Sequence, residues 1–151
     1  IKQTDKEIDD IISSDTQIEQ NYDLLLSIIG IGRVNALKTI ILTENFQAFT
    51  APRRYANYIG VAPFIHESGT SVKKATRVSK AGFSKAKADL SIAVCSAIQN
   101  DPQMKAYWLR KKAEGKPSGV ALNAIKFKIV LRMFAVIKRK KPYVKMDAYK
   151  K

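Results

Sequence analysis

YIGVAPFIHESGTSVKKATRVSKAGF, residues 58–83, is the stretch around which the rest of the chain is organised. It combines turn-forming residues with the only histidine of the chain, His66, and with a run of bases that has no acid between Glu67 and Asp89. Its hydroxyl and basic side chains are Ser68, Thr70, Ser71, Lys73, Lys74, Arg77 and Lys80. Hydroxyls exposed on a turn beside dense positive charge suit an anionic substrate, so we expect a phosphodiester to bind here.

The composition indicates a folded protein with a strongly basic body. The 151 residues are 46% hydrophobic and carry a net charge of +14, and no apolar run approaches the ~20 residues of a membrane span. Residues 1–23 hold seven acids and two bases, a net charge of −5, which leaves +19 for the remainder. An acidic arm on a basic body favours nucleic acid as the partner of that body. A basic ribosomal or membrane-surface protein is the alternative.

The cysteine and histidine counts limit metal and redox chemistry. The single cysteine, Cys95, excludes a disulfide within the chain and a Cys-rich zinc site, and with only one histidine we expect no metal ligands and no cofactor here. The first residues lack the apolar core of a signal peptide, so we expect a cytoplasmic protein. Because the chain begins at Ile1 rather than methionine, we expect it to be a fragment of a longer protein.

Residues 1–26 show the heptad pattern of a helix with two apolar seams, in which two positions are polar. The seams are offset by three residues and consist of Ile1, Ile8, Asp15 and Tyr22, and of Thr4, Ile11, Ile18 and Leu25. Such seams are the pattern of a coiled coil. Two interpretations stay open. The helix packs on its own domain, or it is the returning arm of a coiled coil whose other half lies outside this fragment. Separately, we expect a homo-oligomer that forms through this arm.

A glycine hairpin follows in DLLLSIIGIGRVNALKTIILTE, residues 23–44. Gly30 and Gly32 flank one aliphatic residue between two apolar helices, which lets the backbone turn tightly. The turn also leaves backbone N–H groups at a helix N-terminus, where phosphate binds readily. This pattern resembles a helix-hairpin-helix motif, and Arg33 and Lys38 would add charge to its grip on a DNA backbone. An ordinary αα-hairpin with a glycine turn is the alternative.

The remaining segments predict a mostly α fold: a helical domain with the helix-hairpin-helix-like motif and an N-terminal coiled-coil-like helix. We expect a helix from Pro52 to Gly60, a short β-hairpin or loop near 64–78, and helices over 80–99, 102–113 and 119–140. Ser79 is the predicted N-cap of the 80–99 helix, and Cys95 a small core residue of it. We divide the chain into an arm (1–22), a body (23–141) and a flexible basic tail (142–151).

The order of these pieces resembles the C-terminal transposase domain of the insertion sequence 110 family, which includes pilin-gene invertases. The resemblance covers about residues 23 to 140. The matching pieces are Gly30-Ile31-Gly32, Tyr58-Ile59-Gly60-Val61-Ala62-Pro63, Ser68-Gly69 and Arg77-Val78-Ser79-Lys80-Ala81-Gly82.

The resemblance implies a division of labour between two domains. In the family, a RuvC-like N-terminal domain with four acidic residues binds metal, which implies Mg²⁺, and a coiled coil joins it to the domain seen here. A serine in the loop after the Gly-x-x-Pro segment is the proposed nucleophile. The matching position is Ser68, with Ser71 as a neighbouring rival. Some members are guided by an RNA that the element encodes. The resemblance also implies a bacterial, nucleoid-associated location. The acids of the arm, Asp5, Asp9 and Asp10, do not match the metal ligands.

The implied chemistry agrees with the residue types. A serine hydroxyl needs a base or a metal for activation, and attack on phosphorus needs cations against the developing charge. Lys73, Lys74, Arg77 and Lys80 would supply them, whereas His66 is either a base on the same strand face as Ser68 or an ordinary surface histidine. We expect this fragment alone to bind DNA and to cut poorly. A non-catalytic nucleic-acid-binding module and an assembly domain are the alternatives.

Overall fold

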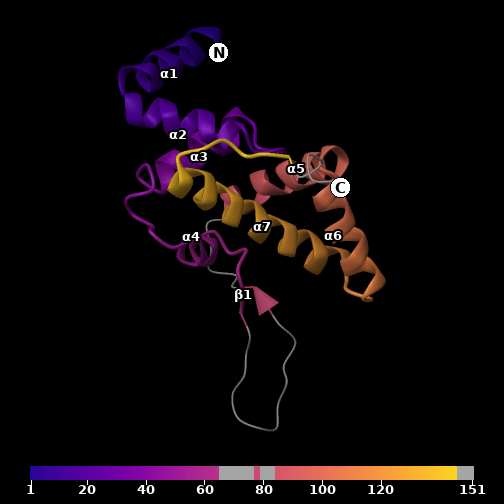
Figure 1. Cartoon of the computed structure of the whole chain (residues 1–151). Coiled ribbons are helices and arrows are strands. Elements are labelled where there is room, and N and C mark those ends of the chain that lie inside the picture. Colours follow the sequence, from indigo (N-terminus) through magenta and orange to yellow (C-terminus); the bar gives the residue numbers. More distant parts are fainter. Residues whose placement is uncertain (65–76, 79–83, 146–151) are drawn as a thin grey trace.

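The structure, a computed structural model, describes residues 1–64, 77–78 and 84–145. Within these residues the chain forms seven helices and one pair of short strands, which confirms the predicted mostly helical fold (Figure 1). The elements are α1 (Lys2–Ser14), α2 (Thr16–Leu26), α3 (Arg33–Leu42), α4 (Pro52–Tyr58), β1 (Pro63–Phe64), β2 (Arg77–Val78), α5 (Ser84–Asn100), α6 (Pro102–Ala113) and α7 (Ser118–Arg139). No helix in this part of the chain is long and apolar enough to cross a membrane.

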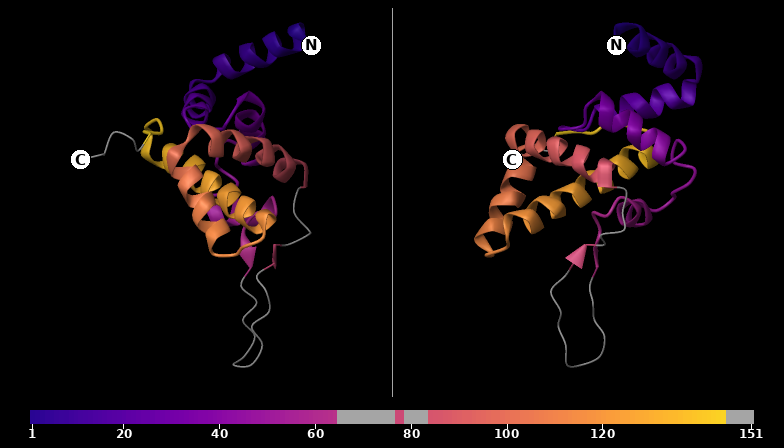
Figure 2. Two further views of the ribbon diagram at one scale, coloured as in Figure 1. Left: turned by 90° about the vertical axis from the view of Figure 1, so that its right-hand side faces the viewer. Right: turned by 180° about the vertical axis from the view of Figure 1, so that it is seen from behind.

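The central element of the fold is α7, which packs against α2, α4, α5 and α6 (Figure 1, Figure 2). Its buried apolar residues recur every three or four positions and are Ala121, Ile125, Ile129, Val130, Met133, Phe134 and Val136. Because this apolar face is broad, one helix can contact several neighbours at once. Full burial of each Ile or Met side chain contributes about 1.5–3 kcal/mol, so α7 is the main scaffold of the body.

The prediction of one helix over residues 1–26 is wrong, because the structure breaks it at Asp15. The Asp15 backbone is extended, and its carboxylate accepts hydrogen bonds from the N–H groups of Gln17 (2.9 Å) and Ile18 (3.1 Å). An aspartate in this N-cap position stabilises a new helix start by about 1 kcal/mol. As a result, α1 packs against α2 and projects from the body instead of continuing along it (Figure 1).

A left-handed turn connects α3 to α4. Glu44, Asn45 and Phe46 have φ of 49°, 54° and 67°, which is uncommon for three successive residues other than glycine. The Asn21 side-chain amide donates to Asn45 Oδ1 (2.8 Å), and the Phe46 ring packs edge-on against Phe134 at 5.0 Å between centroids. These contacts with α2 and α7 hold the turn in place. They direct the chain towards α4, which begins at Pro52 as predicted.

Two pairs of residues bring the ends of the predicted hairpin together. β1 and β2 are antiparallel, with Pro63 opposite Val78 and Phe64 opposite Arg77. The chain reaches β1 from α4 through Gly60, whose φ of 75° ends the helix, and through the fully buried Val61. The apex of the predicted hairpin lies outside the described residues, so only its two ends are placed.

The structure corrects one prediction on α5. Cys95 is exposed, not a core residue. The buried face of α5 consists of Ala86, Leu90, Ala93, Val94 and Ala97. At 3.6 residues per turn, position 95 falls on the opposite side of the helix from that stripe. The predicted N-cap at Ser79 lies outside the described residues.

After α7 the chain returns across the body. Lys140 ends α7 in the left-handed conformation (φ 54°), and the Tyr143 N–H donates to Ser27 Oγ (2.8 Å) just after α2. The Arg132 guanidinium lies over the Tyr143 ring at 4.4 Å from its centroid. Residues up to 145 are therefore placed against the end of α2. The division into arm, body and tail stays a prediction.

Candidate nucleic-acid interface

The predicted glycine hairpin is the turn between α2 and α3. Position 30 needs a glycine because the turn packs closely against α5. Its φ is +95°, and a Cβ at this position would lie 2.5 Å from the Ala93 carbonyl oxygen and 3.0 Å from Ala97 Cβ. Ile28 and Ile31 on either side of the turn are buried. Gly30 is therefore required by the approach of the turn to α5, whatever else binds there.

Gly32 differs from Gly30, because packing does not require it. It is the N-cap of α3, its φ of −100° is open to any residue, and a Cβ there would meet nothing within 4 Å. Ser, Asp or Asn would cap the helix better than glycine. The first N–H groups of α3 have no partner within the helix. The exposed backbone at Gly32 thus leaves an external group room to approach α3.

Arg33, the first residue of α3, is held by the acidic helix α1. Its Nη1 lies 2.6 Å from Asp9 Oδ1, and its Nη2 donates to the backbone oxygen of Asp5 (2.9 Å), whose carboxylate lies 3.8 Å away. The hydrogen bond to Asp9, more than any other interaction, raises the pKa of Arg33. Sequence reasoning placed these acids on the N-terminal arm and did not predict this contact. Any anion at α3 must compete with α1 for this guanidinium.

A cleft of about 510 Å³ lies beside the turn, between α3 and α5. Gly32, Arg33 and Ile92 are among the residues that line it. Lys38, which sequence reasoning counted as a further cation, is paired with Asp89 of α5. Its charge therefore joins the two helices, and Arg33 and the first turn of α3 remain the groups available to an anion at this end of the body.

The described chain places only part of the predicted catalytic stretch. Ser68, Ser71, His66, Lys73, Lys74 and Lys80 lie outside the described residues. Arg77 lies on β2, opposite Phe64. The predicted roles of all these residues stay predictions.

The base of that stretch is firmly anchored, however. Val61 and Ala62, just before β1, are fully buried, and the Val61 carbonyl oxygen accepts a hydrogen bond from the Asn123 side chain of α7 (2.8 Å). Ile59 and Tyr55 of the preceding segment are buried as well. The strand pair thus starts directly from the buried core, and functional loops are commonly positioned by such a scaffold.

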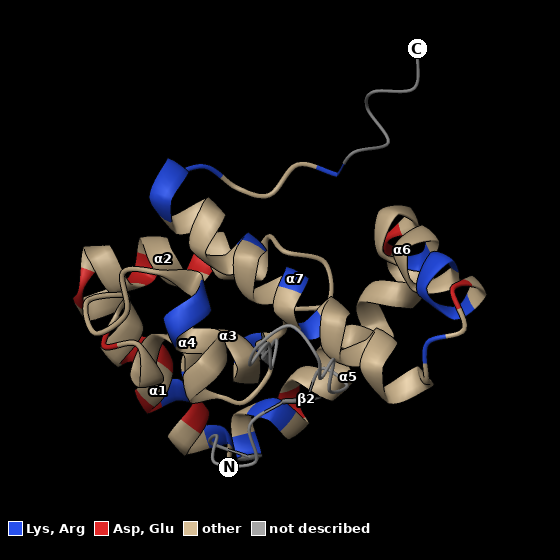
Figure 3. Ribbon diagram, turned by 90° about the horizontal axis from the view of Figure 1, so that it is seen from below, with Lys and Arg blue, Asp and Glu red and all other residues tan. Residues whose placement is uncertain are grey.

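Charge is distributed over the described residues as the sequence predicts. Acidic residues gather on α1 and α2, and basic residues on α6 and the end of α7 (Figure 3). Among the residues that the structure describes, no group of three His, Cys, Asp or Glu could hold a metal ion.

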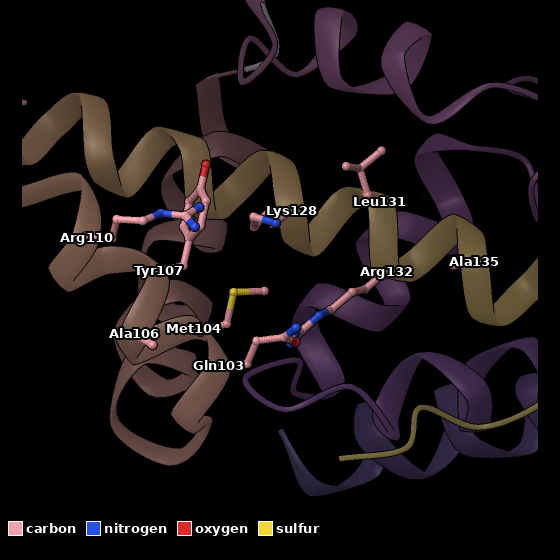
Figure 4. A pocket seen from close by; sticks show the side chains of 9 residues that line it. All are labelled: Gln103, Met104, Ala106, Tyr107, Arg110, Lys128, Leu131, Arg132 and Ala135. Carbon is pink, nitrogen blue, oxygen red and sulfur yellow. The ribbon is translucent and has the colours of Figure 1, made fainter. Parts of the chain in front are cut away.

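A second basic region lies between α6 and α7, and sequence reasoning did not identify it as a site. A groove of about 620 Å³ is lined there by Tyr107, Arg110, Lys128 and Arg132 (Figure 4). Helical spacing in the sequence could have indicated this site. Tyr107 and Arg110 lie one turn apart on α6, and Lys128 and Arg132 lie one turn apart on α7. Which helix α6 would face was not evident from the sequence.

Comparison with known proteins gives consistent matches. A sequence profile of the Transposase IS116/IS110/IS902 family matches residues 22–109. Pilin gene-inverting proteins of Moraxella lacunata and Moraxella bovis are each 26% identical over 146 residues, which cover 96% of this chain and 45% of either relative. The insertion element IS110 uncharacterized 43.6 kDa protein of Streptomyces coelicolor is 24% identical over 115 residues, 76% of this chain and 28% of that protein. The chain thus spans about half the length of the Moraxella relatives.

Proposed function

This chain belongs to the transposase IS116/IS110/IS902 family, and we propose that it forms the DNA-binding and catalytic C-terminal part of a transposase or site-specific recombinase. The observation that carries the proposal is the extent of the family match. Residues 22–109 include both the α2–α3 turn and the whole stretch 58–83. The basic body, with +19 outside residues 1–23, supports DNA as the substrate.

The DNA backbone is the proposed ligand of the α2–α3 turn. A phosphate at Gly32 would accept hydrogen bonds from the first N–H groups of α3 and gain from the positive end of the helix dipole. Arg33 would join it after release from Asp9. Such contacts read no base sequence, so target choice lies elsewhere.

Ser68 is the proposed nucleophile, with Ser71 as the rival. Its Oγ would attack a DNA phosphorus, so that an O–P bond forms and the bond from phosphorus to a deoxyribose oxygen breaks. The serine proton leaves to a base, and the deoxyribose oxygen takes up a proton to become a hydroxyl. Lys73, Lys74, Arg77 and Lys80 are the proposed cations that stabilise the extra charge on phosphorus.

The residues that the structure describes include no group of three metal-ligand side chains. Mg²⁺ is expected of the family's N-terminal domain, and no step of our proposal passes through it. A guide RNA and a homo-oligomer formed through α1 are likewise proposals. The exposed Ile1 and Ile11 of α1 support the second.

Replacement of Ser68 tests the function. In the full-length protein, Ser68→Ala should abolish recombination of DNA that carries the element's junction and leave duplex binding intact. Ser71→Ala is the matched control and should recombine normally. If Ser68→Ala recombines normally and Ser71→Ala does not, the nucleophile is reassigned. If both recombine normally, the chain is a non-catalytic binding or assembly module.

Salt dependence tests the DNA-binding part separately. If about six phosphates are neutralised, log K for duplex DNA should fall against log salt with a slope of about −5. A flat response would contradict the charge argument.

A further inference from the structure

The groove between α6 and α7 has the size and lining of a ligand site. Its volume of about 620 Å³ is within the range of small-molecule sites, roughly 300–1,000 Å³. Tyr107 and Arg110 come from one wall and Lys128 and Arg132 from the other, while Leu131 and Ala135 add apolar surface (Figure 4). A groove of this size accepts one or two nucleotides of a single strand. A double helix is too wide to enter it.

Three cations gather around one aromatic ring at one end of the groove. Lys128 Nζ lies 4.5 Å, Arg110 Cζ 5.0 Å and Lys111 Nζ 5.6 Å from the centroid of the Tyr107 ring. Each contact is favourable by itself, but the three like charges repel one another. A bound anion would relieve that repulsion.

The described part of the chain supplies little negative charge to this cluster. Glu114 lies 2.8 Å from Lys111 Nζ and 3.9 Å from Arg110 Nε. No described carboxylate forms an ion pair with Lys128. Across residues 102–132 the sequence holds eight Lys or Arg residues and one acid. The Tyr107 end of the groove is therefore strongly positive.

The other end of the groove is neutral and fixed. Arg132 Nη1 lies 2.5 Å from Oδ2 of the buried Asp101, and Arg132 Nη2 donates to Gln103 Oε1 (2.6 Å). With its charge balanced by Asp101, Arg132 does not attract a second anion strongly. Polar Gln103 and apolar Leu131 lie beside it. This end suits an uncharged group, such as a base or a sugar.

We propose that the groove between α6 and α7 binds a single-stranded segment of nucleic acid. One phosphate lies between Arg110 and Lys128, and the attached nucleoside lies against Leu131 and Ala135. Positive charge beside aromatic and apolar side chains is the usual composition of single-strand sites. The inference does not rest on the duplex contact at Gly32 or on the role of Ser68.

A charge-matched pair of double variants tests the site in the full-length protein. Arg110→Gln with Lys128→Gln removes two charges from the groove. The control, Lys105→Gln with Lys116→Gln, removes two charges from exposed positions that do not line it. Binding of short oligothymidylate, oligouridylate and duplex DNA is measured by fluorescence anisotropy at several salt concentrations. Thermal melting confirms that both variants fold.

The groove variant should bind single strands about tenfold more weakly, with a salt slope shallower by about 0.7 for each phosphate that the groove no longer neutralises. The control should change binding less than threefold, and duplex binding by the groove variant should match that of the control. Whichever of oligothymidylate and oligouridylate is weakened more identifies DNA or RNA as the ligand. Equal weakening in groove variant and control would overturn the proposal. Weakening on duplex as large as that on single strands would also overturn it.

Photocrosslinking of the unaltered protein provides a test that does not depend on a variant. A single strand with photoreactive uracils should form adducts on Tyr107 or Leu131, located by mass spectrometry. Adducts confined to other helices would contradict the assignment. Because Ser68→Ala should leave these adducts unchanged, failure of this inference and failure of the proposed function are distinguishable.

Discussion

Gly30→Ala should destabilise the fold strongly, because two features of the structure oppose a side chain at this position. The backbone of Gly30 is left-handed, with φ of +95°, a conformation that costs a residue with a Cβ roughly 1–2 kcal/mol. The new Cβ would also lie 2.5 Å from the Ala93 carbonyl oxygen and 3.0 Å from Ala97 Cβ. Such overpacking costs about 1–3 kcal/mol. The sum is about 2–5 kcal/mol.

Thermal and denaturant unfolding, followed by circular dichroism, measures this loss. For a domain of this size we expect a melting temperature lower by about 10 °C. Gly32→Ala is the matched control, because its Cβ meets nothing within 4 Å at a φ of −100°. It should cost less than about 1 kcal/mol, the scale of an N-cap change. If Gly30→Ala is as stable as Gly32→Ala, the turn does not lie against α5 and our account of the cleft is refuted.

Three further predictions concern ion pairs and a buried lysine. Asp5→Asn with Asp9→Asn should release the arginine at the start of α3 and steepen the salt slope of duplex binding by about 0.9, the effect of one neutralised phosphate. Asp101→Ala should lower the free energy of unfolding by about 4 kcal/mol, because it leaves Arg132 unpaired and removes the cap of α6. Lys126 is buried without an acidic partner among the described residues, and burial lowers its pKa. Lys126→Met should therefore stabilise the protein by on the order of 1 kcal/mol at neutral pH.

Each of the three has a control or a contradicting result. Glu7→Gln with Asp10→Asn removes the same charge from α1 and should leave the salt slope of duplex binding unchanged. If this control changes the slope as much as Asp5→Asn with Asp9→Asn does, the effect comes from net charge and not from release of Arg33. Glu114→Ala on α6 should leave the melting temperature almost unchanged. At pH values between the lowered pKa of folded Lys126 and the ordinary pKa of 10.5, the unfolded chain binds more protons than the folded chain. The free energy of unfolding should therefore rise with pH in this range. A rise equally large in Lys126→Met would contradict this assignment.

The sequence predicted those elements whose signals are local. The helix at 102–113 was predicted with its observed bounds, because Asp101 and Pro102 mark an N-terminus by their own chemistry. The turn at Gly30 was predicted for the same reason. Asp15 shows the limit of this reasoning, since it was counted as a polar exception in a heptad although it caps a new helix.

The contacts of Arg33 and those of the cations around Tyr107 were not predictable, because they join segments that are distant in the sequence. Asp9 and Arg33 are 24 positions apart, and nothing in the periodicity of residues 1–26 indicates that an acid of α1 pairs with the first residue of α3. The cluster around Tyr107 depends on which face of α7 meets α6. Helical spacing gives the face of each helix, whereas the pairing of faces is a property of the packed core.

Covalent trapping in the full-length protein tests the central claim most directly. The protein is incubated with labelled DNA that carries the element's junction, and protein–DNA adducts are isolated on denaturing gels and located by mass spectrometry. Our account predicts an adduct on Ser68, absent in Ser68→Ala. An adduct on Ser71 would keep the mechanism and correct the residue. An active enzyme that forms no adduct would contradict the account, because water or a DNA hydroxyl would then be the nucleophile.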